Sequence, residues 1–359
     1  MRLHSLPINL LPLLMVLFFV LPSPAAERPE RPFVKPAALK PGDTIALVAP
    51  ARPIRPEDAD FISRGLEAKG YKVKAAPNIT TNTRLKYLAG PDQLRADTLM
   101  EAFRDPEVDA IFCVTGGYGT SRLLDKLDYG VIRENPKVIT GFSDITGLHL
   151  ALNRHAGLIT FHAPTHRFAV TDNRTERPFA APNFWNLLSA ETWEHRPQDE
   201  PYTLSTDGIT TPMVTLTPGI GQGRLIGGNL SLISATMGTP YEIHTDGCIL
   251  FIEDVREAPY RVDRMLAQLK LAGKLDKLQG VVVGHFTDAQ PDDPHDSFTV
   301  EELFDQYFGG RGYPVLLYYP VGHITENSTI PVGVMAELNA EAKTLTLLES
   351  PFHTGKPKQ

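Results

Sequence analysis

The sequence predicts an α/β protein with a parallel sheet in its first half and a second α/β domain after it. Short apolar runs alternate with segments of helical spacing, which is the pattern expected for βαβ units. The periodicity weakens between about Thr165 and Thr210 and then resumes, so the chain contains two alternating blocks. A length of 359 residues is also sufficient for two domains of about 150 residues, each with its own core.

The composition excludes several classes of protein. A hydrophobic content of 42% is too high for intrinsic disorder, and a formal net charge of -7 does not suit a nucleic-acid-binding surface. Two cysteines, Cys113 and Cys248, cannot build a disulfide scaffold or a four-thiolate zinc site. Both lie in strand-like apolar runs, so we expect buried free thiols.

The N-terminal segment predicts export. Arg2 provides a positive start, residues 10–21 form a nearly unbroken apolar run, and small residues follow at 22–26. The run is short for a membrane span, so we expect a cleaved signal peptide at 1–26 and a periplasmic mature protein without stable membrane insertion. No cysteine lies at the cleavage site, which argues against lipid attachment. An uncleaved anchor is the alternative.

The elements of the first block follow in order. Apolar runs predict strands at 44–49, 71–75, 110–115 and 137–140, and helical spacing predicts helices at 56–70, 94–103 and 121–127. Because strands alternate with helices, right-handed crossovers would bury a parallel sheet between two helical layers. We assign residues 27–170 to this N-terminal domain.

The second block has the same alternation. A connecting region at 171–210 carries a helix near 184–188, and the C-terminal domain at 211–359 follows. Strands are expected at 225–226, 248–252, 280–283 and 345–348, and helices at 230–237, 261–271 and 300–308.

Ser143 lies at the junction of an apolar strand ending at Gly141 and a helix beginning at Ser143 or Asp144. This position exposes a hydroxyl at the carboxyl end of a parallel strand, next to the free N–H groups of a helix start. Serine and aspartate are also ordinary N-cap residues, so Gly-x-Ser-Asp is a weak signal by itself.

A second candidate is the loop Gly116-Gly117-Tyr118-Gly119, which follows another predicted strand. Glycines allow the backbone to approach a ligand and to present free amides. The spacing matches neither nucleotide-binding fingerprint. An oxyanion hole, a phosphate loop and a plain tight turn all remain open.

Charged groups follow two strand-like runs of the second block. Glu253 and Asp254 come directly after the apolar run 248–252, and His323 follows the run 315–319. Polar groups at the carboxyl ends of parallel strands face the crevice in which α/β proteins bind ligands. Solvated or helix-capping acids are the simpler interpretation.

Taken together, ordered segments of the chain resemble the LD-carboxypeptidase family, the serine peptidases that trim murein tetrapeptides, which also includes microcin-type self-immunity hydrolases. The resemblance covers nearly all of the mature chain and is specific because many short motifs recur in order. They are residues 40–50 (KPGDTIALVAP), 116–124, 141–146, 227–230, 238–240, 252–254, 259–266 and 322–323.

The resemblance implies a catalytic apparatus. Ser143 corresponds to the nucleophile, His323 to the general base and Glu253 to the acid that orients the base, with no metal or cofactor. The amides of Gly117 and Asp144 correspond to the oxyanion hole. Ser121, also near glycines, competes as nucleophile, but we place it inside a helix.

The resemblance also implies a fold and a substrate. A flavodoxin-like N-terminal domain would carry the serine, a C-terminal β/α domain would carry the acid and base, and the active site would lie at their interface. The substrate would be a murein peptide whose scissile bond joins an L-configured centre to terminal D-alanine. Family members commonly form homodimers.

A cation should recognise the terminal carboxylate, because arginine binds carboxylates bidentately. Arg261 and Arg264 are candidates, although a helix-surface role is an equal alternative, and Tyr118 is a further candidate substrate contact. Many family members carry arginine before the paired glycines, whereas this chain has Thr115.

Three functions fit these observations. The first is a periplasmic LD-carboxypeptidase, although members that act in peptidoglycan recycling are typically cytoplasmic. The second is an immunity-type hydrolase of peptidyl-nucleotide antibiotics, and the third is a non-catalytic periplasmic solute-binding protein.

Overall fold

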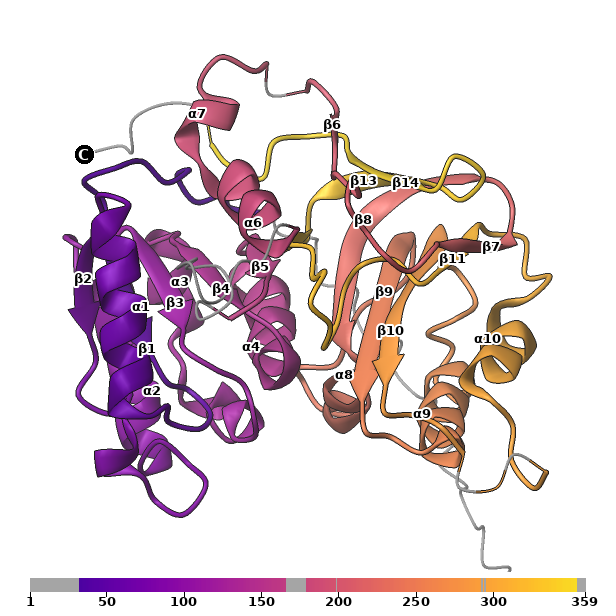
Figure 1. Cartoon of the computed structure of the whole chain (residues 1–359), viewed down its shortest axis with the longest axis horizontal. Coiled ribbons are helices and arrows are strands. Elements are labelled where there is room, and N and C mark those ends of the chain that lie inside the picture. Colours follow the sequence, from indigo (N-terminus) through magenta and orange to yellow (C-terminus); the bar gives the residue numbers. More distant parts are fainter. Residues whose placement is uncertain (1–31, 166–178, 198, 292, 294, 354–359) are drawn as a thin grey trace, which may run out of the picture. The chain divides into compact units, whose positions relative to one another are not determined.

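A parallel sheet forms the centre of the first half of the chain (Figure 1). The computed structural model describes residues 32–165, 179–197, 199–291, 293 and 295–353. The sheet has the strand order β12-β5-β4-β3-β1-β2, in which β2, β1, β3, β4 and β5 are parallel and β12 is antiparallel to β5. The order 2-1-3-4-5 is that of flavodoxin-like folds, as expected. The strands are β1 (Thr44–Val48), β2 (Lys72–Ala75), β3 (Ala110–Cys113), β4 (Val138–Gly141), β5 (Thr160–His162) and β12 (Ile330–Val332).

Helices cover both faces of this sheet, and its central strands β1, β3 and β4 are buried at every position, as expected for parallel strands between two helical layers. In β1, Ile45 and Leu47 join the core under α1 and α6, while Ala46 and Val48 face the core under α2 and α4. The helices are α1 (Pro56–Ala68), α2 (Asp92–Arg104), α3 (Tyr129–Glu134), α4 (Thr146–Ala151), α6 (Ala180–Leu188) and α7 (Ala190–Trp193). Both cysteines are buried free thiols, as expected.

One helix of the first block was wrongly predicted. Instead of a helix over 121–127, the chain forms two short 3-10 turns, Thr120–Arg122 and Leu124–Lys126. Thr120 is bound to Asp144 at one end, and the Tyr129 hydroxyl donates to the Leu124 carbonyl at the other. We attribute the tighter turns to these two tethers.

The second half contains a mixed sheet with the order β6-β14-β13-β8-β9-β10-β11-β7. Strands β8 to β11 are parallel, and the remaining strands extend both edges in antiparallel pairs. The strands are β6 (Tyr202–Thr203), β7 (Val214–Thr217), β8 (Ile220–Asn229), β9 (Cys248–Val255), β10 (Gly280–Thr287), β11 (Val315–Leu317), β13 (Met335–Asn339) and β14 (Thr344–Leu347). The parallel centre was predicted, whereas β6, β7 and β13 were not.

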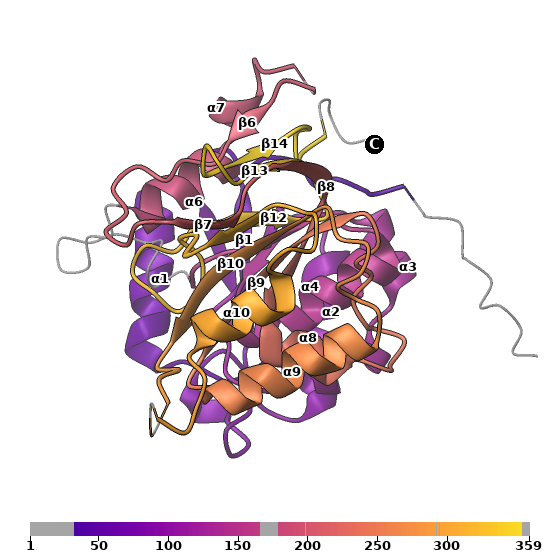
Figure 2. The ribbon, with the colours of Figure 1, turned by 90° about the vertical axis from the view of Figure 1, so that its right-hand side faces the viewer.

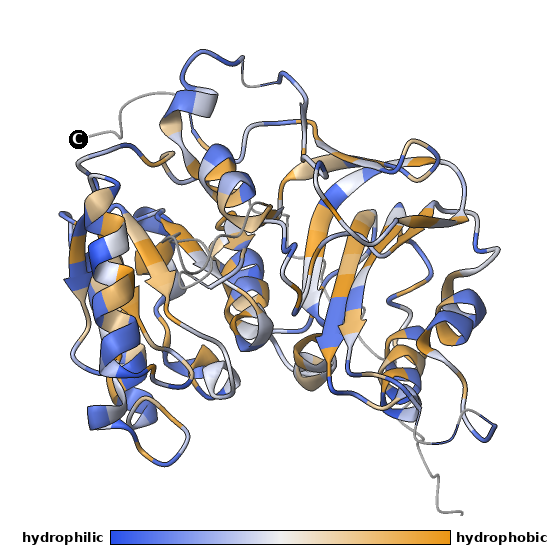
Figure 3. Ribbon diagram, in the orientation of Figure 1, coloured by the Kyte–Doolittle hydropathy of each residue, from blue (hydrophilic) through white to orange (hydrophobic). Residues whose placement is uncertain are grey.

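Helices α8 (Leu230–Thr236), α9 (Pro259–Leu271) and α10 (Val300–Phe308) cover one face of this sheet (Figure 2). Alternation along the strands separates two cores. Leu250 and Ile252 of β9 point toward the helices, whereas Ile249 and Phe251 point to the other face. Strands β9 and β10 are apolar along most of their length and become hydrophilic near their ends (Figure 3).

The two halves share one hydrophobic core. A single cluster of buried residues includes Leu47 and Phe112 of the first sheet and Leu225 and Phe251 of the second. Strand β12 lies within the range 211–359 that we assigned to the C-terminal domain, yet it pairs with β5 of the first sheet. The predicted boundary between residues 170 and 171 and the predicted signal peptide lie outside the described residues.

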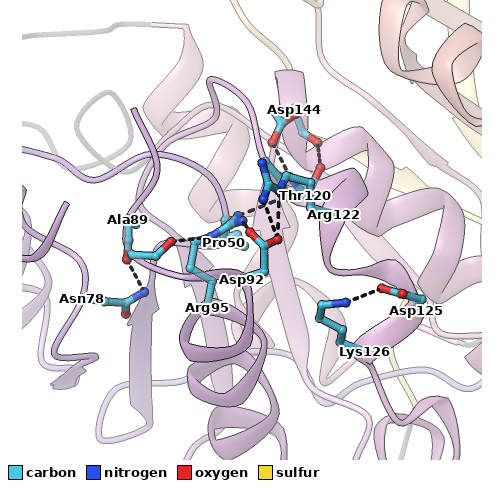
Figure 4. A network of polar contacts seen from close by, with 12 residues as sticks. Pro50, Asn78, Ala89, Asp92, Arg95, Thr120, Arg122, Asp125, Lys126 and Asp144 are labelled. Carbon is cyan, nitrogen blue, oxygen red and sulfur yellow. Dashed lines mark hydrogen bonds and ion pairs between the residues drawn. The ribbon is translucent and has the colours of Figure 1, made fainter. Parts of the chain in front are cut away.

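A fully buried arginine holds together the loops at the carboxyl edge of the first sheet (Figure 4). The guanidinium of Arg95, on α2, donates to the carbonyls of Pro50, Gly90 and Gly119, with distances of 3.3 Å to Gly90 and 3.0 Å to Gly119. It also pairs with Asp92 one turn earlier. Each carbonyl belongs to a different loop, so one side chain determines the spacing of three loops.

We predict that Arg95→Met lowers the free energy of unfolding by roughly 3 kcal/mol or more, because it leaves three buried carbonyls without their donor and removes one of the two guanidinium groups bound to Asp92. Urea denaturation of the purified protein measures this loss. The matched control is Arg122→Met, which removes an exposed guanidinium from the same Asp92 and should cost less than about 1 kcal/mol. Equal losses in the two variants would contradict the assigned role of Arg95.

Candidate active site

Ser143 occupies a strained turn at the carboxyl end of β4. Its φ of 61° is in the left-handed region, which non-glycine residues avoid. The chain passes from Gly141 through Phe142 into a 3-10 turn at Ser143–Ile145 and then into α4. Ser143 is half-buried, while its neighbours on both sides are buried. This is the geometry of a nucleophile elbow, in which a sharp turn presents a serine hydroxyl.

The glycine-rich loop packs directly on this turn. A Cβ at Gly116 would lie 3.1 Å from the Ser143 Cβ and 3.3 Å from the Asp144 nitrogen, so a side chain there would crowd the serine. The next residue, Gly117, has a φ of 112° and is exposed. The loop therefore places backbone beside the serine where only glycine fits.

Asp144 ties the loop to the turn. Its carboxylate accepts a hydrogen bond of 2.9 Å from the Thr120 amide, and the Thr120 hydroxyl donates to the Asp144 carbonyl at 2.5 Å. Burial raises the pKa of Asp144, and the bond from the Thr120 amide partly opposes that effect. The side chain of Asp144 is therefore structural.

A buried carboxylate meets an imidazole at the end of β9. The Oε2 atom of Glu253 lies 2.8 Å from Nδ1 of His323, and the glutamate side chain is fully buried. Gly322 makes room for this contact, because a Cβ there would lie 3.3 Å from Oε2. With Nδ1 engaged by the carboxylate, Nε2 is the ring nitrogen that remains for proton transfer.

The imidazole also lies against the serine turn. The ring centroids of His323 and Phe142 are 4.9 Å apart, and Phe142 immediately precedes Ser143. The structure thus brings together segments that the sequence separates by about 180 residues, and the serine, histidine and glutamate named from the sequence lie in one region.

Asp254, the second acid of the pair, has a different environment. Its carboxylate accepts bonds from the Asn229 side chain at 2.9 Å and from the Ser231 amide and hydroxyl at 2.9 and 2.8 Å. Burial raises its pKa. Both acids lie inside β9 and are buried, whereas the sequence predicted that they follow the strand.

The two halves also meet through polar contacts beside the site. The backbone amide of Asn229 donates a 3.0 Å hydrogen bond to the hydroxyl of Thr146 at the start of α4. Gly228 packs against the same threonine so closely that a Cβ would lie 2.5 Å from its hydroxyl oxygen.

The predicted substrate contacts lie at the surface. Arg261 is exposed on α9, 3.6 Å from Glu257 and bonded to the Tyr260 hydroxyl, and Arg264 lies over the Tyr260 ring. Tyr118 is 48% exposed and packs edge-on against Tyr87 at 5.8 Å. Tyr118 therefore projects from the loop that contacts Ser143, while Arg261 has local partners.

Sequence reasoning missed two buried histidines behind the serine turn. The Nε2–H of His149 donates a 2.9 Å bond to the Gly141 carbonyl, and neither ring nitrogen of His162 has a hydrogen-bond partner among the described residues. The rings lie 6.2 Å apart. Arg95 was also missed, since nothing in the periodicity of α2 distinguishes a buried arginine from an exposed one.

Within the described residues, no set of three or more histidine, cysteine or acidic side chains is placed to hold a metal ion. Likewise, the described helices are all too short or too polar to cross a bilayer.

A strained serine in an α/β fold, packed beside a carboxylate-bound imidazole, defines a serine-type hydrolase. Comparison with known sequences specifies the family. The profile of the LD-carboxypeptidase N-terminal domain matches residues 45–163, and that of the LD-carboxypeptidase C-terminal domain matches residues 222–338. The chain therefore belongs to the LD-carboxypeptidase family and is a serine carboxypeptidase, not a solute-binding protein.

Relatives and solved structures agree with this assignment. The chain is 38% identical over 315 residues to a probable murein peptide carboxypeptidase of Bacillus subtilis, an alignment covering 87% of this chain and 94% of the relative. A muramoyltetrapeptide carboxypeptidase from Oxalobacter formigenes superposes with a TM-score of 0.71 at 30% identity, covering 85% of this chain and 97% of that one. Microcin C7 self-immunity protein MccF superposes with a TM-score of 0.77 at 26% identity, covering 89% and 100%.

The buried histidines predict acid sensitivity. Burial lowers the pKa of His149 to about 4 and that of His162 well below its ordinary value. Between pH 6.5 and 4 the unfolded chain takes up protons that the folded chain does not, so stability falls as the pH falls. The slope should approach about 1.4 kcal/mol per pH unit for each histidine.

His162→Phe should keep the packing and flatten this slope, as measured by urea denaturation at pH 7 and pH 5. The control is His295→Gln, at an exposed histidine. An unchanged slope in His162→Phe would show that His162 is not a source of the acid sensitivity.

Proposed function

We propose that this enzyme hydrolyses the L,D-peptide bond of murein tetrapeptides and releases terminal D-alanine. The observation that carries the proposal is the 2.8 Å bond between Glu253 and His323, with the imidazole packed against the residue before Ser143. The names of the similar enzymes supply the substrate class.

In the proposed mechanism, the Ser143 hydroxyl attacks the scissile carbonyl while Nε2 of His323 accepts its proton. Glu253 holds the Nδ1–H and stabilises the positive imidazolium that forms. His323 then gives the proton to the leaving amine of D-alanine. Water, deprotonated by the same nitrogen, releases the peptide from Ser143.

The carbonyl oxygen becomes negative during each attack. The amides of Gly117 and Asp144, on the two segments that adjoin Ser143, are the proposed donors to it. Loss of one such donor typically costs about 10²–10³ in turnover. The packing of Gly116 on Ser143 and the Thr120–Asp144 bonds support this role, because they hold the glycine-rich loop against the serine turn.

We further propose that residues 1–26 are a cleaved signal and that the enzyme acts in the periplasm as a homodimer. The apolar run at 10–21 and the small residues after it support export. N-terminal sequencing of the secreted protein and light scattering test these two points. An intact N-terminus would contradict cleavage of the signal, and a monomer in solution would contradict the homodimer.

The first test uses a tetrapeptide ending in an L,D bond, with free D-alanine as the readout. We expect activity in the wild type and a loss of about 10⁴-fold or more in Ser143→Ala and in His323→Ala. Ser121→Ala is the control and should keep full turnover. Full activity in both site variants would exclude the mechanism.

A substrate panel separates the proposed activity from the immunity-type alternative. The panel contains L,D-linked and D,D-linked peptides and a peptidyl-nucleotide analogue. Cleavage of the nucleotide analogue alone would favour the alternative.

Replacing Glu253 by glutamine tests the orienting acid. The amide cannot stabilise the imidazolium, so turnover should fall by about 10²–10⁴-fold while the protein stays folded. Asp254→Asn is the matched comparison: it should lower the melting temperature, because the amide keeps only one of the two oxygens that accept from Asn229 and Ser231, with little effect on turnover. If Glu253→Gln has wild-type kinetics, another group orients His323.

A further inference from the structure

Arg52 lies in the loop that leaves the carboxyl end of β1, and the backbone of this loop is firmly held. The preceding carbonyl of Pro50 accepts a bond from Arg95, and the carbonyl of Ala51 accepts a 3.0 Å bond from the Ala89 amide. The Ile54 amide donates a 2.8 Å bond to the Ile79 carbonyl. The backbone on both sides of Arg52 is therefore anchored.

The side chain of Arg52 lies over the glycine-rich loop. A Cβ at Gly117 would lie 2.8 Å from the Arg52 Cδ and 3.0 Å from its Cγ. The aliphatic part of the arginine thus rests on the residue whose amide we propose for the oxyanion hole. Because the backbone is anchored and the stem lies over Gly117, the guanidinium can reach the space beside this loop.

The charge of Arg52 has no partner among the described residues. The arginine is exposed and forms no ion pair or side-chain hydrogen bond with them. Two buried or nearby arginines at this edge are engaged, Arg95 with loop carbonyls and Arg122 with Asp92. Arg52 therefore supplies a cation that no group of the described residues neutralises.

The distances suit one part of the proposed substrate. The carboxylate carbon of a C-terminal residue is three bonds from the scissile carbonyl carbon, so its cation must lie within roughly 8 Å of that carbon. A Cβ at Gly116 would contact Ser143 and a Cβ at Gly117 would contact the Arg52 stem, so the stem of the arginine lies over the residue next to the one packed on the serine.

We propose that Arg52 binds the terminal carboxylate of the substrate and so limits the enzyme to cleavage at a free C-terminus. This inference rests on the proposed function and adds the residue that selects the substrate end. Arg261 is the competing assignment, but its guanidinium already has Glu257 and Tyr260 as partners.

The test compares a tetrapeptide having a free C-terminal carboxylate with the same peptide ending in a carboxamide. Arg52→Met keeps an apolar stem over Gly117 and removes the charge. We expect kcat/KM for the acid to fall by about 10- to 100-fold, chiefly through KM, with little change for the amide. Arg52→Lys keeps the charge without the bidentate fork and should be intermediate.

The control is Arg55→Met. Arg55 follows Arg52 in the same loop, is exposed and pairs with Asp58, so this variant should keep the wild-type ratio of kcat/KM for the acid and the amide. Melting temperatures establish that each variant is folded, and if Arg52→Met does not fold, Arg52→Lys and Arg52→Gln provide the comparison.

Three results would overturn the inference: an unchanged acid-to-amide ratio in the Arg52 variants, an equal fall for both substrates, or loss of selectivity in Arg261→Met instead. A wild-type enzyme that cleaves neither peptide would overturn the proposed function itself, and this inference with it.

Discussion

The hydrogen bond between Glu253 and His323 is the interaction on which the arrangement of the site depends. A carboxylate that is fully removed from water is costly unless strong partners compensate it. Only one of the Glu253 oxygens has a hydrogen-bond partner within the described chain, and that partner is the imidazole. The burial of Glu253 therefore favours one orientation of His323, with Nδ1 toward the acid and the ring packed against Phe142 of the serine turn.

The three buried acids near the site, Asp144, Asp254 and Glu253, have different roles. Asp144 joins the glycine loop to the serine turn, and Asp254 joins the end of β9 to the start of α8. The Asp144 carboxylate accepts from a backbone amide and the Asp254 carboxylate from backbone and side-chain donors, whereas Glu253 has the imidazole. Adjacent residues such as Glu253 and Asp254 can differ in this way because successive side chains of a strand point to opposite faces.

Close backbone packing makes the geometry of the site possible. Gly116, Gly117 and Gly322 each occupy a place where a Cβ would contact Ser143, Arg52 or Glu253. The strain at Ser143 is maintained by the packing around it, since its neighbours on both sides are buried. Arg95 also stabilises this edge of the sheet, because its hydrogen bonds to loop carbonyls fix the spacing of the loops.

The sequence alone determined the α/β class, most parallel strands of both sheets, though not β5, and most helices, because apolar periodicity reports which face of each element is buried. The motif order identified the family and the residues Ser143, Glu253 and His323. Tertiary structure decided what periodicity does not encode. The edge strands β6 and β7 are short and partly exposed, β13 is half-exposed, and β12 crosses to the first sheet by a long-range pairing. Three further features arise from segments that meet only after folding, so no local sequence pattern predicts them. They are the burial of Arg95, the lack of a hydrogen-bond partner for the His162 ring among the described residues, and the contact of Arg52 with Gly117.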